Sequence, residues 1–150
     1  MNNYIIIQET DFQKARRKIR EAKKTEKKVI FTSDDDELNR KILEKEAIDI
    51  LLINLKGRKD RQKQRDSGLN HVLAKLAKKQ GVVIGINLDE ILASSAKEKS
   101  NILARIRQNI KICSKNKVKM KFISKDEQDI YNLKSLGLVL GMPTWVTKEV

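Results

Sequence analysis

Residues 67–86 read SGLNHVLAKLAKKQGVVIGI, the pattern of one amphipathic helix followed by one buried strand. Ser67 can cap a helix from Gly68 to Gln80, and Gly81 is placed to end it. The apolar stripe of this helix consists of Leu69, Val72, Leu73 and Leu76. Val82 to Ile86 is apolar without polar alternation, which indicates a strand covered on both faces. The unit is typical of an α/β fold with a parallel sheet.

The same alternation extends over the whole chain. Apolar runs predict buried parallel strands at Tyr4–Ile7, Val29–Thr32, Ile50–Ile53, Val82–Ile86, Met120–Ile123 and Leu138–Leu140. Further helices are predicted from the Asp11 cap to about Lys24, after Asp34–Asp36 to near Lys45, from Ser95 or Ala96 through Ser114, and from Asp126 through Leu136 before Gly137. About six parallel strands fit an open wound sheet or an incomplete barrel, because a closed eightfold barrel takes about 250 residues. We expect one α/β domain over residues 1–150.

The composition points to a polyanionic partner. The 150 residues carry 33 Lys and Arg against 20 Asp and Glu, a formal charge of +13, and 39% of them are hydrophobic. This describes a globular domain with a strongly ionised surface rather than a disordered tail. Nucleic acid is the first candidate partner and a membrane surface the second. A general lysine bias is the third explanation, since Lys outnumbers Arg 24 to 9.

Compartment and redox state follow from what the sequence lacks. No apolar run approaches the roughly 20 residues of a membrane span, and residues 1–7 have neither the basic start nor the length of a signal peptide. The single cysteine, Cys113, excludes an internal disulfide and a cysteine-based zinc site. We therefore expect a reducing, cytoplasmic location.

Positive charge is segregated along the chain. Three segments are strongly basic, with net charges of +7 for residues 14–28, +4 for residues 56–66 and +8 for residues 97–121, whereas residues 33–49 carry −4. Clustering favours a binding footprint over a uniform lysine bias. In the first segment the basic residues surround the helix and interleave with Glu21 and Glu26, which indicates an ordinary solvated helix.

The segment KGRKDRQKQR, residues 56–65, differs from the other two because it follows a strand and lacks apolar anchors. Ligands of parallel α/β folds meet the loops after the carboxyl ends of strands, and arginine-rich segments can become ordered on RNA. Two interpretations stay open: an RNA contact, which we favour, and a disordered, solvated loop.

Catalytic patterns are scarce. The chain has no P-loop, no G-x-G-x-x-G and no nucleophile elbow, and Asp34 to Glu37 is explained by helix capping rather than by magnesium. His71 is the one histidine and is expected at the surface or in a cap. Cys113 shares an apolar helix face with Ile106 and Ile110 and is expected in the core. Away from that face, four cations are expected to be free to grip phosphates: Arg105, Arg107, Lys111 and Lys115.

Residues 65–77, RDSGLNHVLAKLA, resemble a segment of protein component 3 of archaeal ribonuclease P, the counterpart of the thirty-kilodalton subunit of the eukaryotic enzyme. Three further stretches agree in order and spacing: GINL at 85–88, NILARIRQN at 101–109, and LGLVLGM at 136–142. The resemblance covers roughly residues 56 to 142.

The resemblance implies a short, TIM-barrel-like fold and a protein subunit of the ribonucleoprotein that removes 5′ leaders from precursor tRNA. It implies that the RNA subunit performs a magnesium-dependent cleavage, so we expect no catalytic residue, metal or cofactor on this chain. The implied partners are the RNase P RNA, a small RRM-like protein subunit and other RNase P proteins, with precursor tRNA reached indirectly. Residues expected to face RNA are Arg58, Lys59, Arg65, Lys79, Arg105, Arg107, Lys115 and Lys148.

This chain departs from the family pattern in several places. The family's Arg-Lys-Asp corresponds either to Arg58-Lys59-Asp60 or to Arg65-Asp66, because an extra basic stretch lies between them. Residues 124–126 stand where the family has a turn of small residues, and Gln128 or a neighbour replaces an arginine. Relative to the family pattern, we expect the chain to lack about one βα unit toward the N-terminus and the usual C-terminal tail, so that the barrel would not close and its open edge would need a partner. The rival functions are a stand-alone metal-dependent phosphoesterase of related fold and a generic RNA-binding module.

Overall fold

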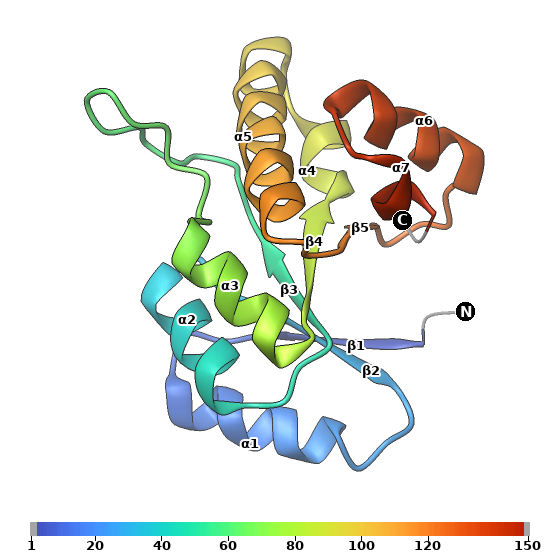
Figure 1. Ribbon diagram of the computed structural model, residues 1–150. Coiled ribbons are helices and arrows are strands. Elements are labelled where there is room, and N and C mark those ends of the chain that lie inside the picture. The colour runs from blue at the N-terminus through green and yellow to red at the C-terminus, as the bar shows by residue number, and fades with distance from the viewer. Residues whose placement is uncertain (1–2, 149–150) are drawn as a thin grey trace.

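Five parallel strands form a sheet whose spatial order is their order in the chain, which confirms the α/β class (Figure 1). The computed structural model describes residues 3–148. Its strands are β1 (Tyr4–Gln8), β2 (Lys28–Thr32), β3 (Ile50–Ile53), β4 (Val83–Asn87) and β5 (Met120–Ile123). Each pairs in parallel with the next, for example Leu51 with Ile84.

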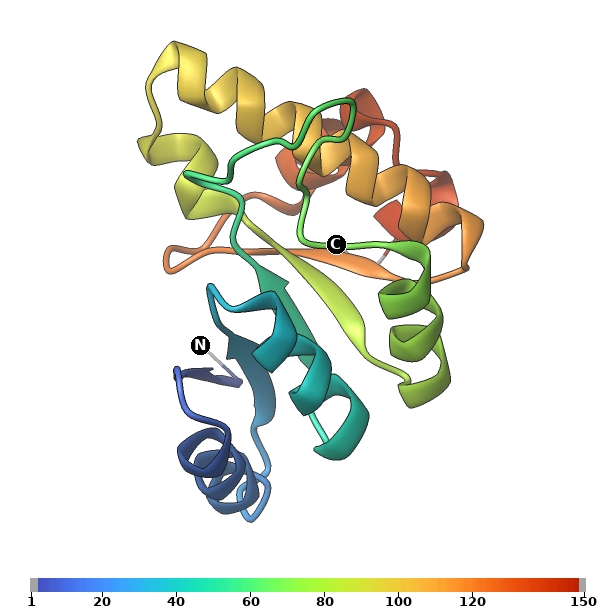
Figure 2. The ribbon, with the colours of Figure 1, turned by 90° about the vertical axis from the view of Figure 1, so that its left-hand side faces the viewer.

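Helices connect the strands and cover one face of the sheet (Figures 1 and 2). They are α1 (Phe12–Ala22), α2 (Asp36–Lys45), α3 (His71–Gln80), α4 (Leu88–Ala93), α5 (Ala96–Lys115), α6 (Ile130–Leu140) and α7 (Thr144–Thr147). Parallel crossovers are right-handed, so a sheet in chain order places its crossover helices on the same side, as in a TIM barrel.

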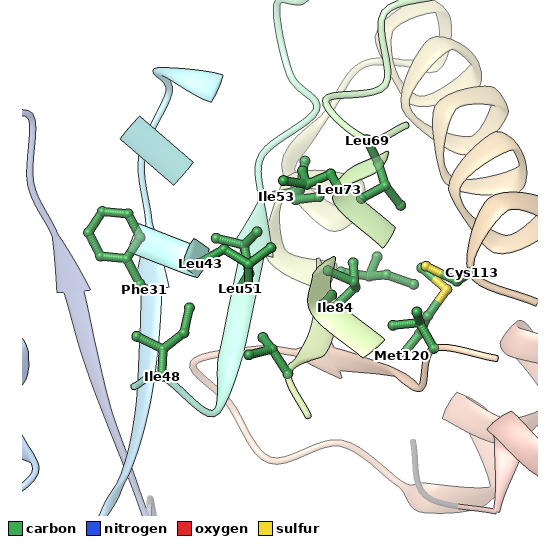
Figure 3. Packing of buried hydrophobic residues seen from close by; sticks show 14 of the residues in the cluster. Phe31, Leu43, Ile48, Leu51, Ile53, Leu69, Leu73, Ile84, Cys113 and Met120 are labelled. Atoms are coloured by element: carbon green, nitrogen blue, oxygen red, sulfur yellow. The ribbon is translucent and has the colours of Figure 1, made fainter. Parts of the chain in front are cut away.

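Alternate residues of each strand enter two separate cores. On β3, Leu51 and Ile53 face the helices and belong to the large core, part of which is drawn in Figure 3. Ile50 and Leu52 face the other side and pack with Ile30 and Ile123 in a small core on the concave face. Strands buried on both faces explain why the sequence lacks polar alternation there.

The sheet is open, as expected of an incomplete barrel. Within residues 3–148 no backbone ladder joins β5 to β1. Across the concave face, the Lys121 ammonium donates a hydrogen bond to the Tyr4 hydroxyl at 2.6 Å. Ile6, on the same face of β1 as Tyr4, remains 53% exposed at the edge.

The predicted strand Leu138–Leu140 is wrong, because these residues form the end of α6. Gly137 does not end that helix: it lies inside, where a Cβ would come within 2.9 Å of the Met142 sulfur. The helix ends instead at Gly141, whose φ of +104° is readily adopted only by glycine. An apolar run of three residues cannot distinguish a strand from the last turn of a helix that is buried on one side.

Two helix starts also differ from the prediction. Asn70, not Ser67, caps α3 by accepting a hydrogen bond from the Leu73 amide. Asp129, not Asp126, caps α6. The cap at Asp11 and the glycine stop at Gly81, with φ of +69°, are confirmed.

Candidate nucleic-acid interface

The basic segment between β3 and α3 is a folded loop with an exposed tip (Figure 1). Arg61 and Gln64 exchange two backbone hydrogen bonds, of 2.9 and 3.1 Å, so the chain turns sharply between them. Lys63 occupies this turn with φ of +64°. The tip projects from the body in Figure 1, and its side chains from Arg61 to Arg65 are exposed.

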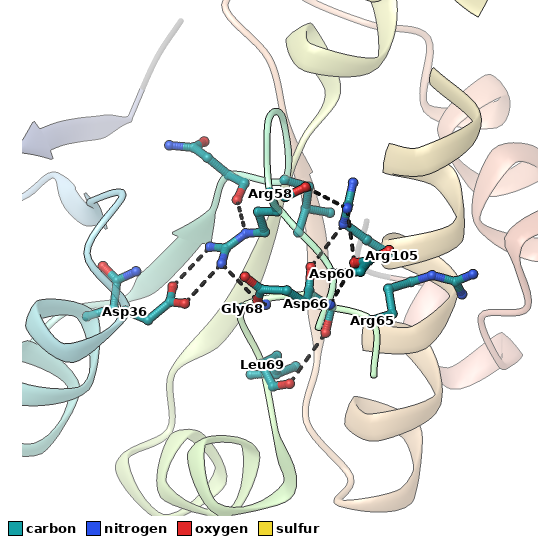
Figure 4. Close-up of polar contacts among 12 residues, drawn as sticks. Asp36, Arg58, Asp60, Arg65, Asp66, Gly68, Leu69 and Arg105 are labelled. Atoms are coloured by element: carbon teal, nitrogen blue, oxygen red, sulfur yellow. Dashed lines mark hydrogen bonds and ion pairs between the residues drawn. The ribbon is translucent and has the colours of Figure 1, made fainter. Parts of the chain in front are cut away.

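Arg58 holds the start of the loop against α2 and the end of the loop (Figure 4). Its guanidinium makes a two-pronged ion pair with Asp36, at 2.9 and 3.0 Å, and a third bond of 3.2 Å to Asp66. Its Nε donates to the carbonyl of Asn54 at 2.7 Å. The side chain is only 10% exposed. Burial lowers the pKa of Arg58, but the bonds and charges of Asp36 and Asp66 outweigh it and raise the pKa above its usual value.

Gly68 is required where the loop passes Arg58. Its φ is +72°, and an added Cβ would lie 2.6 Å from Nη2 of Arg58 and 2.8 Å from Cγ2 of Ile53. Its amide also donates to the carboxylate of Asp66 at 3.1 Å. A side chain at this position would therefore displace the guanidinium from its carboxylates.

Arg105 reaches from α5 and fixes the loop from the other side (Figure 4). Its guanidinium donates to the carbonyls of Asp66 and Arg58 at 2.9 and 2.8 Å, and to the carboxylate of Asp60 at 3.1 Å. The residue is 5% exposed. The expectation that Arg105 projects away from the core is wrong, because its guanidinium replaces water as the partner of loop carbonyls. We call Arg58 and Arg105 together the arginine clamp.

Other side chains complete the attachment of the loop to its surroundings. On α5, Gln108 donates to the carbonyl of Arg65 and Asn109 to the carbonyl of Ser67. At the start of the loop, the Glu90 carboxylate accepts from the Leu55 and Lys56 amides. The Asp66 amide donates a hydrogen bond to the Asp60 carboxylate at 2.9 Å. This bond, together with the hydrogen bond and charge of Arg105, lowers the pKa of Asp60. These contacts make the loop part of the fold.

A hollow of about 350 Å³ lies beside the loop, between α2 and α3. Its lining combines apolar side chains of α3, such as Val72 and Leu76, with three cations and three acidic residues: Arg40, Arg61, Arg65, Asp36, Glu37 and Asp66. Val72 is 64% exposed.

The structure separates the predicted RNA-facing residues into two groups. Arg58 and Arg105 form the arginine clamp, and their guanidinium groups are bound to carboxylates and loop carbonyls. The others are exposed: Lys59 and Arg65 on the loop, Lys79 in the last turn of α3, Arg107 and Lys115 on α5, and Lys148 after α7. Contact with RNA stays a prediction for all eight.

The three carboxylates of the clamp, Asp36, Asp60 and Asp66, and the close approach at Gly68 were not expected. One signal was available. Arg105 lies three residues after Ile102 and four before Asn109, so helical spacing puts it on the buried stripe of α5.

Neither His71 nor Cys113 forms a catalytic arrangement. His71 is exposed at the start of α3, and its Nδ1 lies 2.9 Å from the Asn116 amide nitrogen. Cys113 is fully buried, and burial raises the pKa of its thiol to about 12. Among residues 3–148, no three His, Cys, Asp or Glu side chains are grouped to hold a metal ion. None of the helices in that range is long and apolar enough to cross a membrane.

Known proteins resemble this chain in fold and in sequence. A chain in a structure of archaeal ribonuclease P with mature tRNA is similar, with a TM-score of 0.81 and 25% identity over 97% of this chain and 62% of that one. A second structure, of an uncharacterized protein, is similar in fold alone, with a TM-score of 0.60 and 12% identity over 92% of this chain and 38% of that one.

Sequence relatives carry the name ribonuclease P protein component 3. One from Methanococcus maripaludis is 31% identical over 79% of this chain and 48% of its own length. One from Methanocaldococcus jannaschii is 35% identical over 65% of this chain and 39% of its own length. The chain thus spans about half the length of the curated relatives it matches. The model of the family RNase P subunit p30 matches residues 5–146, and the chain therefore belongs to this family.

Proposed function

We propose that this chain is an RNA-binding part of a ribonuclease P protein subunit, which assists removal of the 5′ leader from precursor tRNA. Membership of the p30 family supports this, as does similarity to a chain of archaeal ribonuclease P with mature tRNA. The observation that carries it is the arginine clamp. It uses Arg58 and Arg105 to hold a loop whose remaining cations, Lys56, Lys59, Arg61, Lys63 and Arg65, are exposed.

The loop's contribution is electrostatic and entropic. Its exposed arginines can pair with phosphate oxygens in two-pronged geometry, and each neutralised phosphate releases counterions. Because the clamp already fixes the backbone, ordering the loop on RNA costs less free energy than ordering a free segment. Arg107, Lys111 and Lys115 are further exposed cations on α5, the helix against which the loop is held.

We assign bond cleavage to the RNA subunit with its magnesium ions, and no cofactor to this chain. The protein contributes binding and charge neutralisation. The partners we propose are the RNase P RNA and a small RRM-like protein subunit, which would contact the strand edges or helices of the open sheet. Precursor tRNA would be reached through the assembled enzyme, in the cytoplasm.

Reconstitution tests the proposal. The cognate RNase P RNA is assayed for precursor-tRNA cleavage over a magnesium series, alone, with the RRM-like protein, and with that protein and this chain. We expect the complete mixture to reach half-maximal cleavage at a lower magnesium concentration than either other mixture. An unchanged magnesium requirement would contradict the proposal. Cleavage by the chain without RNA would favour the phosphoesterase, for which residues 3–148 offer no cluster of metal ligands.

A further inference from the structure

The two ends of the sheet differ in charge. The connections that lead from a helix into the next strand, counted with one flanking residue on each side, cover residues 22–28, 45–50, 80–83 and 115–120. They hold eight basic and three acidic residues. In Figure 2 they follow one margin of the molecule, from the α1–β2 turn at the bottom to the α5–β5 turn at the right. We call this margin the amino-end rim.

The opposite end has the opposite sign, except for residues 54–70, the loop between β3 and α3 that the arginine clamp holds and that we call the clamped loop. The connections at residues 8–12, 32–36, 87–88 and 123–130 hold eight acidic residues and one basic residue. The clamped loop is thus one basic projection from an acidic end, while the amino-end rim is basic at both of its extremes. A polyanion that reached only the carboxyl ends of the strands would meet repulsion beside that loop.

Helix dipoles account for Lys45 and Lys115, which lie in the last turns of α2 and α5, but not for four other lysines of the rim. The dipole favours cations within the last turn of a helix, whereas Lys27, Lys28, Lys117 and Lys119 lie beyond any last turn. Lys28 and Lys121 are strand residues on the concave face, where barrel interiors are normally filled by bulky apolar side chains. Lys121 contacts the Tyr4 hydroxyl and ring across the open sheet, and both ammonium groups place positive charge at this end of the concave face.

Three of these lysines line a cavity of about 540 Å³ at the rim end of the concave face. Among residues 3–148, the cations of its lining are Lys28, Lys119 and Lys121, and Asp49 is the one acidic lining residue. The Asp49 carboxylate already accepts hydrogen bonds from the Val29 amide at 2.7 Å and the Lys23 ammonium at 3.1 Å. Within residues 3–148 no ion pair joins Lys28 or Lys121 to a carboxylate.

Tyr4 adds a neutral donor to this cavity. Its hydroxyl oxygen accepts the hydrogen bond from Lys121, so its own O–H proton is available to an acceptor inside the cavity. Ammonium groups converging with a phenolic donor match the oxygens of a phosphate group, which accept hydrogen bonds and carry negative charge.

We propose that this cavity and the amino-end rim form a second RNA contact, which takes phosphate groups of the RNA backbone at the end of the sheet opposite the clamped loop. The inference rests on the proposed function and extends it, since the RNA would then contact both ends of the sheet. Its contacts are to the backbone alone, so binding there carries no preference for base sequence.

The test compares two variants of equal charge. The rim variant is Lys28→Gln, Lys119→Gln and Lys121→Gln, and the control is Lys41→Gln, Lys97→Gln and Lys125→Gln, which removes three cations elsewhere. Dissociation constants for the cognate RNase P RNA are measured over a salt series. Each lost phosphate contact flattens the plot of log affinity against log salt by about 0.7 to 0.9, so we expect the rim slope to fall by about 2 and the control slope to stay near that of the unmodified chain. Thermal unfolding shows whether each variant is folded. If the triple rim variant does not fold, the double variant Lys28→Gln with Lys119→Gln is measured in its place.

Equal slopes for the rim and control variants would overturn the inference. A parallel titration with inorganic pyrophosphate separates the sources of phosphate. If the rim variant loses pyrophosphate binding but keeps the full RNA slope, the cavity takes a small anion and the RNA contact is refuted. Failure of the unmodified chain to bind RNase P RNA would instead refute the proposed function. If changing the loop arginines alone abolishes RNA binding, and the rim variant keeps the salt slope of the unmodified chain, the proposed function stands and this inference is refuted.

Discussion

Arg105 provides the sharpest test of the clamp. In Arg105→Met the aliphatic part of the side chain is kept, while the carbonyls of Asp66 and Arg58 lose their guanidinium partner. A carbonyl left unpaired away from water costs about 1 to 3 kcal/mol. Asp60 is 47% exposed in its side chain and can recover its hydrogen bond from water, so it adds little. We expect the free energy of unfolding to fall by about 2 to 4 kcal/mol.

Arg107→Met is the matched control, two residues along the same helix and exposed. Exposed substitutions of this kind change stability by about 0.5 kcal/mol or less. Urea unfolding at neutral pH measures both variants. Arg105→Lys should recover only part of the loss, because one ammonium group cannot reach three acceptors in the fork geometry of a guanidinium. A loss below about 1 kcal/mol for Arg105→Met, or an equal loss for Arg107→Met, would refute the reasoning.

Three further predictions follow from single side chains. Gly68→Ala should destabilise the fold more than Gly57→Ala, because both have positive φ, near +72° and +74°, but only the Cβ at Gly68 meets Arg58; thermal unfolding of the two variants decides this. The Cys113 thiol, whose pKa burial raises to about 12, should react with iodoacetamide at pH 8 only after unfolding in urea, and rapid native labelling would contradict its burial. Burial raises the pKa of the Glu90 carboxyl above its ordinary value of 4.5, although hydrogen bonds from the Leu55 and Lys56 amides lower it. This raised pKa adds to the stability of the folded state at pH values below 4.5, and the added stability is lost as the pH rises through the raised pKa. The stability of the unmodified chain relative to Glu90→Gln should therefore decline as pH rises, and a difference that grows with pH would contradict this.

Periodicity in the sequence was sufficient for most of the sheet. The five observed strands were predicted because each is an apolar run between turn residues, and both faces of a parallel strand are buried. The error at Leu138–Leu140 has the same origin, since a helix packed on one face can end in an equally apolar run. The six-residue helix α4 was missed because it follows β4 directly and leaves no room for a periodic pattern.

The site was harder to predict because its contacts are distant in the sequence. Arg58 was expected to face RNA, yet it pairs with Asp36, which lies 22 residues earlier. Arg105 reaches Asp60 across 45 residues. Local charge counts treat such residues as surface cations. They identify the basic loop correctly but cannot tell the arginines that hold it from those that remain exposed.

The most direct test of the central claim is the salt dependence of RNA binding after removal of the exposed loop arginines. Arg61→Gln with Arg65→Gln is compared with Lys14→Gln and Arg17→Gln in α1, which removes the same charge from a solvated helix. If the clamped loop contacts phosphates, the loop variant should bind the cognate RNase P RNA more weakly, with a slope smaller by about 1.5, while the α1 variant keeps its slope. An unchanged slope for the loop variant would contradict the claim that this loop is an RNA-binding surface.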